Sequence, residues 1–122
     1  MNKNARAWVK ALQSGEYKQG IGSLCADNLY CCLGVACELY QKATNKLVIE
    51  EKSAGFGAVM RCYNRMASIL PPEVIEWLGL RDERGSFGRN RILTDENDRG
   101  KSFLSIARII IRNQKTLFVE SS

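Results

Sequence analysis

The chain has 122 residues, of which 45% are apolar and 25% are charged, as in an ordinary soluble domain. This composition excludes a disordered chain, because the apolar side chains provide enough buried surface to offset chain entropy. No apolar run approaches the roughly 18–20 residues of a membrane span, and no repeat or linker divides the sequence, so we expect one domain over residues 1–122.

The net charge is +5, from 18 Lys and Arg against 13 Asp and Glu. A basic balance favours anionic partners: nucleic acid, nucleotides or acidic proteins. Acidic residues are interleaved with the basic ones, as in residues 81–84 and 95–99. A nucleic-acid-coating protein usually has a stripe of one sign, so a small anionic ligand held in a few pockets fits this pattern at least as well.

Histidine is absent from the sequence, which removes the commonest general base and the commonest zinc ligand. We therefore expect binding rather than catalysis, with no catalytic residue, cofactor or metal. The five cysteines form no C-x-x-C pair and are predicted to be free, buried thiols. The first residues lack the apolar segment of an export signal, so a reducing cytosol is the expected compartment.

The first half of the chain predicts two helices separated by a hairpin or an extended pair of segments. Apolar residues recur at helical spacing over residues 4–14, whereas residues 17–30 are Gly-rich with an Asp-Asn turn signal. A buried helix is expected from about residue 30 to residue 43. Strands are expected at residues 46–50 and 58–63.

The second half begins with a helix that Pro71-Pro72 opens and Gly79 ends. Residues 81–101 are predicted to form a long polar loop, with a short strand between residues 86 and 91. Ser102 is the expected N-cap of a helix that runs to about residue 113, and residues 116–119 are predicted to form a last strand. The sequence thus predicts an α+β fold, a small and mainly antiparallel sheet packed with three or four helices.

The last predicted helix carries two arginines on the same side. Arg108 and Arg112 are four residues apart and project from one side. Two guanidiniums in this arrangement suit a pyrophosphate, although cations near a helix C-terminus also complement its dipole.

The polar loop before that helix contains the other candidates. Phe87 is followed by Gly88 and Arg89, which suits a stacking platform for a base; the alternative is a plug over the core. Asn97 is a candidate for reading a base or ribose edge, and Asp98 beside it is a candidate ligand contact. Their alternative role is an ordinary turn leading into the next helix.

Four segments, at residues 8–20, 30–37, 70–80 and 93–103, resemble a family of small phage proteins that includes the phage Thoeris anti-defence sponges. The Tyr-Cys-Cys-Leu-Gly-Val block at residues 30–35 is the most specific of them. The resemblance implies a protein of the host bacterial cytoplasm that binds a cyclic ADP-ribose isomer, made by a TIR-domain immune enzyme, and holds it uncleaved. It also implies dimers or larger homo-oligomers with pockets near subunit contacts, and in some relatives a separate site for cyclic oligonucleotides.

Matched onto this chain, the family pocket places a loop aromatic at Phe87 and an asparagine ten residues later at Asn97. The arginines that meet the pyrophosphate fall on Arg108 and Arg112. The expected nucleotide-binding set is completed by Arg89 and Asp98. The alternatives are a small basic nucleic-acid-binding regulator of the phage, or a protein-binding inhibitor of a host factor; no membrane partner is expected.

Overall fold

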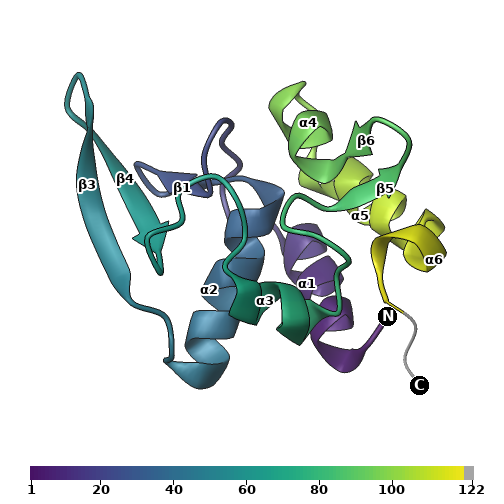
Figure 1. Ribbon diagram of the computed structural model, residues 1–122. Coiled ribbons are helices and arrows are strands. Elements are labelled where there is room, and N and C mark those ends of the chain that lie inside the picture. Colours follow the sequence, from purple (N-terminus) through teal and green to yellow (C-terminus); the bar gives the residue numbers. More distant parts are fainter. Residues whose placement is uncertain (120–122) are drawn as a thin grey trace.

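The computed structural model describes residues 1–119, which form an α+β fold with two antiparallel sheets (Figure 1). The helices are α1 (Lys3–Ser14), α2 (Cys32–Thr44), α3 (Pro72–Leu78), α4 (Leu93–Asp98), α5 (Phe103–Arg112) and α6 (Gln114–Leu117). The strands are β1 (Cys25–Ala26), β2 (Leu29–Tyr30), β3 (Ile49–Gly55), β4 (Ala58–Tyr63), β5 (Ser86–Gly88) and β6 (Arg91–Ile92). The predicted fold class is confirmed.

The larger sheet has the strand order β2-β1-β4-β3, and β5 and β6 form a separate hairpin. The β3–β4 hairpin pairs Ile49 with Tyr63 at its base and has a register shift between Ser53 and Gly55 near its tip. In Figure 1 this hairpin stands at one side of the molecule, and α4, α5, α6 and the β5–β6 hairpin lie at the other. Helices α1 and α2 lie between them.

Helix α1 forms where the apolar stripe predicts it, and Asn2 caps it by accepting a hydrogen bond from the Ala5 amide. Trp8 and Leu12 face the core, where the Trp8 indole N–H donates to the Cys32 carbonyl at 2.8 Å. Because α1 packs against α2, α3 and α5, it joins the two sides of the molecule. None of the helices in the part of the chain described is long and apolar enough to cross a membrane.

Helix α2 is buried along most of its length, as its sequence predicts. Gly34, within the Cys-Cys-Leu-Gly-Val block, lies against the backbone of the segment that enters β1. A Cβ atom at this position would stand 1.8 Å from the Leu24 carbonyl oxygen. The glycine is therefore required by a close approach of two backbones, and this explains one residue of the block in physical terms.

Three local predictions were wrong. Residues 93–98 form helix α4 instead of loop, because buried Leu93 anchors the turn and Asp95 and Glu96 lie in its first turn. The predicted strand at residues 116–119 overlaps helix α6: Leu117 is buried, and only an isolated bridge joins Phe118 to Leu80. Strand β3 starts at Ile49, later than predicted, because Leu47 is held by the Gln41 side chain.

Candidate functional site

Asn97 lies at the end of α4 with its side chain fully buried. Its Oδ1 accepts hydrogen bonds from the Gln19 amide at 2.9 Å and the Cys32 backbone N–H at 3.2 Å. Its Nδ2 donates to the Gly20 carbonyl at 2.8 Å and more weakly to Asp98 Oδ1 at 3.3 Å. One amide thus ties together three of the four segments that carry the family resemblance. Its hydrogen-bonding groups are occupied within the chain, so the geometry gives Asn97 a structural role in place of the predicted contact with a base or ribose.

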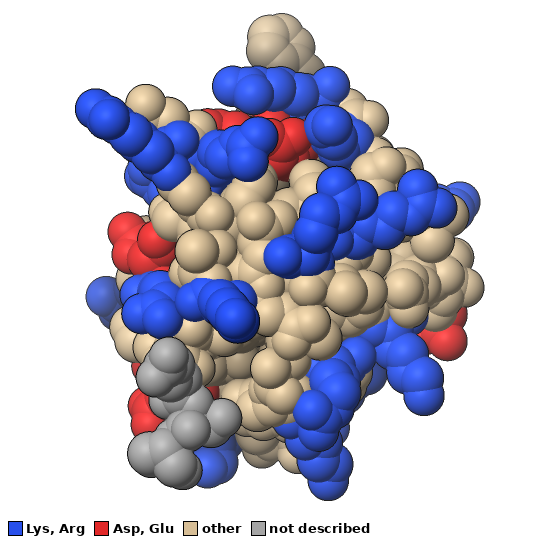
Figure 2. All heavy atoms as spheres, turned by 90° about the vertical axis from the view of Figure 1, so that its right-hand side faces the viewer, with Lys and Arg blue, Asp and Glu red and all other residues tan. Residues whose placement is uncertain are grey.

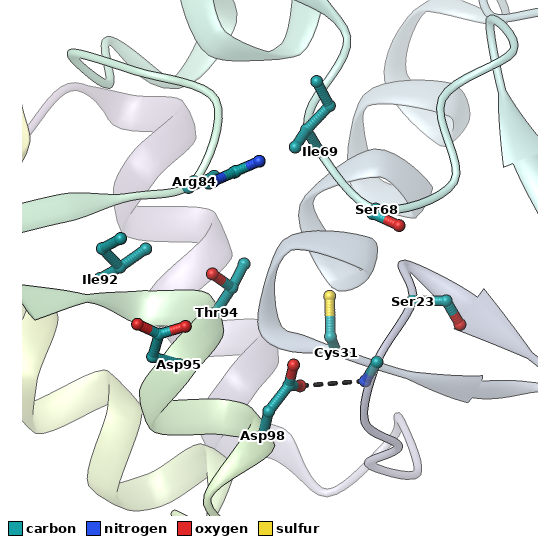
Figure 3. A pocket seen from close by; sticks show the side chains of 10 residues that line it. Ser23, Cys31, Ser68, Ile69, Arg84, Ile92, Thr94, Asp95 and Asp98 are labelled. Atoms are coloured by element: carbon teal, nitrogen blue, oxygen red, sulfur yellow. Dashed lines mark hydrogen bonds between the residues drawn. The ribbon is translucent and has the colours of Figure 1, made fainter.

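Asp98 lies at the edge of a cleft of about 190 Å³. Its Oδ1 accepts from the Gly22 backbone N–H at 3.0 Å. Figure 3 shows Arg84 and Ile69 across this cleft from Thr94, Asp95 and Asp98 of α4, with Cys31 at its base. We call this the mixed-charge cleft.

The mixed-charge cleft suits an anion poorly. Two carboxylates and one guanidinium line it, so its formal charge opposes a pyrophosphate. Its volume is also below the roughly 300–1,000 Å³ of typical small-molecule sites. The Cys31 thiol is no nucleophile there, because burial raises its pKa to about 11. The five cysteines are all buried and free, as predicted.

A second surface collects the positive charge. Helices α1, α5 and α6 contain no Asp or Glu and carry six cations that are all exposed. We call it the basic helical face, and it consists of Lys3, Arg6 and Lys10 of α1, Arg108 and Arg112 of α5, and Lys115 of α6. Elsewhere the chain has 12 Lys and Arg against 13 Asp and Glu, a net charge of −1. These three helices therefore carry all of the protein's excess positive charge.

Seen from the α5 and α6 side, the molecule presents many Lys and Arg side chains, with Asp and Glu showing mainly near the outline (Figure 2). Among residues 1–119, no carboxylate lies within 4.0 Å of any of the six cations. Their charges are consequently available to a ligand. Because exposed cations of one sign repel one another, a bound anion relieves that repulsion.

Two hollows lie on the basic helical face. The C-terminal hollow, of about 510 Å³, is lined by residues 111–116, including Arg112 and Lys115. The α1 hollow, of about 480 Å³, is lined by Lys3, Arg6 and Lys10. Ile111, which is 43% exposed, lines both hollows and makes them neighbours.

Phe87 lies in β5 and is only 6% exposed. The Arg91 guanidinium lies 5.9 Å from its ring centroid. The ring thus packs in the core, which is the alternative that the sequence left open, and it offers little surface to a base. Its carbonyl nevertheless accepts a 3.0 Å hydrogen bond from Thr116 Oγ1, and Thr116 lines the C-terminal hollow. Phe87 therefore supports the wall of that hollow.

The structure places five of the six predicted site residues at two places, and the sixth, Arg89, apart from both. Asn97 and Asp98 belong to the mixed-charge cleft and the network beneath it. Arg108 and Arg112 lie one helical turn apart on the basic helical face, and Phe87 supports its C-terminal hollow. Arg89 is exposed at the turn between β5 and β6. Neither Phe87 nor Asn97 lines the mixed-charge cleft, the C-terminal hollow or the α1 hollow.

Sequence reasoning missed the four cations Lys3, Arg6, Lys10 and Lys115. The available signal was the distribution of acidic residues, since none occurs in residues 1–15 or in residues 99–119. That signal requires knowing that the two ends of the chain meet. They meet through the packing of α1 on α5.

Fold and surface together define a small α+β protein with one strongly basic helical face. A protein-family model matches residues 1–115, and the chain belongs to that family, described as Domain of unknown function (DUF8296). No curated protein and no solved structure matches the chain.

Proposed function

We propose that this protein binds and sequesters a cyclic ADP-ribose-type signalling nucleotide in the cytoplasm of an infected bacterium, without cleaving it. The nucleotide would be one made by a TIR-domain immune enzyme, and its removal would block Thoeris defence. The observation that carries the proposal is the C-terminal hollow on an acid-free helical surface. The resemblance to the anti-defence family supplies the class of ligand.

The charge of the hollow matches this ligand. Arg112 and Lys115 line the hollow, and Arg108 lies one helical turn before Arg112 on α5. These two helices thus offer three cations to the two negative charges of a pyrophosphate. Guanidinium groups bind phosphate oxygens in a planar, two-pronged geometry. The volume of about 510 Å³ falls within the usual range for small ligands. The mixed-charge cleft has neither the positive charge nor the volume that such a ligand needs.

A sponge also needs tight binding, and one open hollow provides little burial. Nanomolar affinity corresponds to about 12 kcal/mol, whereas each charge-assisted hydrogen bond contributes about 1.5–3 kcal/mol. We propose that a second copy of the chain closes the hollow. Leu104 and Ile111 support this step, because they are 54% and 43% exposed on α5 and offer apolar surface to a partner.

Ligand capture tests the proposal. The purified protein is incubated with an equimolar cyclic ADP-ribose isomer, passed through a desalting column and heated, and the released nucleotide is identified by mass spectrometry. We expect stoichiometric recovery of the intact cyclic compound and a dimer or larger species in light scattering. A cyclic dinucleotide added as competitor tests whether the second class of ligand shares the site.

The double variant Arg108→Gln/Arg112→Gln should weaken capture at least tenfold. The matched control, Lys46→Gln/Lys52→Gln, removes the same charge from exposed positions outside the three helices and should capture normally. Recovery of a linear or hydrolysed nucleotide would contradict sequestration. Equal capture by all variants would exclude the C-terminal hollow as the site.

A further inference from the structure

The basic helical face extends well beyond the C-terminal hollow. Lys3, Arg6 and Lys10 occupy positions i, i+3 and i+7 of α1, which place them on one side of the helix. At a rise of about 1.5 Å per residue, they span roughly 10 Å along its axis. The proposed nucleotide site uses none of these three residues.

The α1 cations and the α5–α6 cations form one surface. Lys3, Arg6 and Lys10 line the α1 hollow, Arg112 and Lys115 line the C-terminal hollow, and Ile111 lines both. Six charges spread over three helices exceed what a ligand with two phosphates needs. Such an extended array matches a polymer of phosphates, and duplex DNA carries one negative charge per about 1.7 Å of its axis.

We propose that the basic helical face binds the phosphate backbone of double-stranded nucleic acid, without reading its sequence. This inference does not require nucleotide capture, because three of the six cations, those of α1, have no part in the proposed nucleotide site. The charge distribution supports it: the three helices offer only positive charge, while the remainder of the chain is nearly neutral.

The side chains of this face favour a duplex over single strands and membranes. Single-stranded nucleic acids are usually held by exposed aromatic side chains on which bases stack, and bilayer interfaces favour aromatic anchors. On these helices the aromatic residues are Trp8 and Phe103, which are 0% and 8% exposed. Leu104 and Ile111 are aliphatic. Contact with the backbone of a duplex uses the charges and needs no aromatic platform.

The amides of the face also argue against sequence reading. Asn113 Nδ2 donates to the Ile109 carbonyl at 2.8 Å, and Gln114 Nε2 donates to the Ile111 carbonyl at 3.0 Å. Asn and Gln side chains are the usual readers of adenine edges. Both of these amides are already engaged with carbonyl groups at the C-terminal end of α5.

Fluorescence anisotropy with labelled 20-base-pair DNA and RNA duplexes of arbitrary sequence tests the proposal. Contacts with five or six phosphates predict a slope of about −5 in a plot of log binding constant against log salt, from roughly 0.9 per phosphate. Affinity should therefore fall about a thousandfold between 50 and 200 mM salt. Shuffled sequences should bind equally.

In the variant Lys3→Gln/Arg6→Gln/Lys10→Gln, the magnitude of that slope should decrease by about 2.7, because three phosphate contacts are lost. Its capture of the cyclic nucleotide should be unchanged. The control Lys46→Gln/Lys52→Gln/Arg65→Gln removes the same charge from exposed positions elsewhere and should keep the wild-type slope. Circular dichroism of each variant verifies that it is folded.

The proposal is overturned if neither duplex binds at 50 mM salt, or if the α1 and control variants weaken binding equally. Preferential binding of a single strand overturns it as well. Binding to vesicles that contain phosphatidylserine, with no binding to duplexes, would assign the face to anionic membranes instead. A normal duplex slope with no nucleotide capture would sustain this inference and reject only the proposed function.

Discussion

Asn97 shows how one buried side chain can hold distant segments in place. Its amide joins Gln19 and Gly20 to the start of α2 at Cys32, across 65 or more residues of sequence. A buried amide is suited to this task because it offers both donors and acceptors. From sequence, the same residue is equally compatible with a ligand contact, a turn or a structural network, since spacing alone does not reveal burial.

Replacing Asn97 by Ala should destabilise the fold strongly. The variant leaves the buried Cys32 N–H and the half-buried Gly20 carbonyl without their partner, and losing the partner of a buried polar group costs about 1–3 kcal/mol. We expect the free energy of unfolding, measured by urea denaturation, to fall by about 2–4 kcal/mol. The exposed amide Gln13 is the control, and Gln13→Ala should change stability by less than about 0.5 kcal/mol. A wild-type midpoint for the Asn97 variant would show that the network adds nothing to stability.

At the scale of elements, the sequence predicts those helices and strands that have a strong apolar periodicity and clear capping residues at their ends. Helices α1, α2, α3 and α5 were predicted within a few residues, as was strand β4. Gly79 ends α3 in the left-handed conformation, and the Ser102 side chain caps α5, as expected. In these elements, the local secondary-structure propensity and the pattern of buried side chains favour the same structure.

The remaining elements depend on contacts that a sequence does not display. Helix α4 is rich in Asp, Asn and Thr, which are poor helix formers, and it forms because Leu93 and Asn97 find buried partners. The charged helices illustrate the same point for function. Arg108 and Arg112 could be singled out from their spacing, but their neighbours on α1 come from the opposite end of the chain.

The close approach of α2 to the segment before β1 gives a second prediction. Gly34→Ala places a methyl group 1.8 Å from the Leu24 carbonyl oxygen. The close atoms belong to the backbone and not to a flexible side chain, so α2 must shift away from Leu24 to relieve the clash. We expect a loss of about 3 kcal/mol in the free energy of unfolding, at the upper end of typical overpacking costs. Thermal unfolding followed by circular dichroism measures it.

The comparison variant is Ala43→Gly, at an exposed position of the same helix. It should cost only about 1 kcal/mol, through helix propensity. If the two variants are equally stable, the approach of α2 does not require a glycine.

At the scale of the whole molecule, alkaline pH should unfold the protein. Burial, and then the charge of Glu38, raise the pKa of Tyr30 to about 12. Burial also raises the pKa of Tyr63, whose hydroxyl donates to Glu38 Oε2 at 2.5 Å. In the unfolded chain both phenols ionise near pH 10.

The folded state therefore binds these protons more tightly than the unfolded chain does. Its full stability is present below about pH 10 and is lost as the pH rises toward 12. Urea denaturation at intervals from pH 8 to pH 11.5 should show this decline, and Tyr63→Phe should make it shallower. A free energy of unfolding that stays constant to pH 11.5 would contradict the role of these phenols.

The packing of α1 against α5 has a consequence for how the protein is made. During translation the first helix leaves the ribosome long before the fifth is synthesised, and the two are separated by more than 85 residues. Until that late helix emerges, the apolar side of the first one lacks its last neighbour, and contacts so remote along the chain form slowly. The packing of the first helix is therefore completed only after the fifth has been synthesised. A chain cut short before residue 103 would keep that apolar side exposed and would be prone to aggregation and degradation.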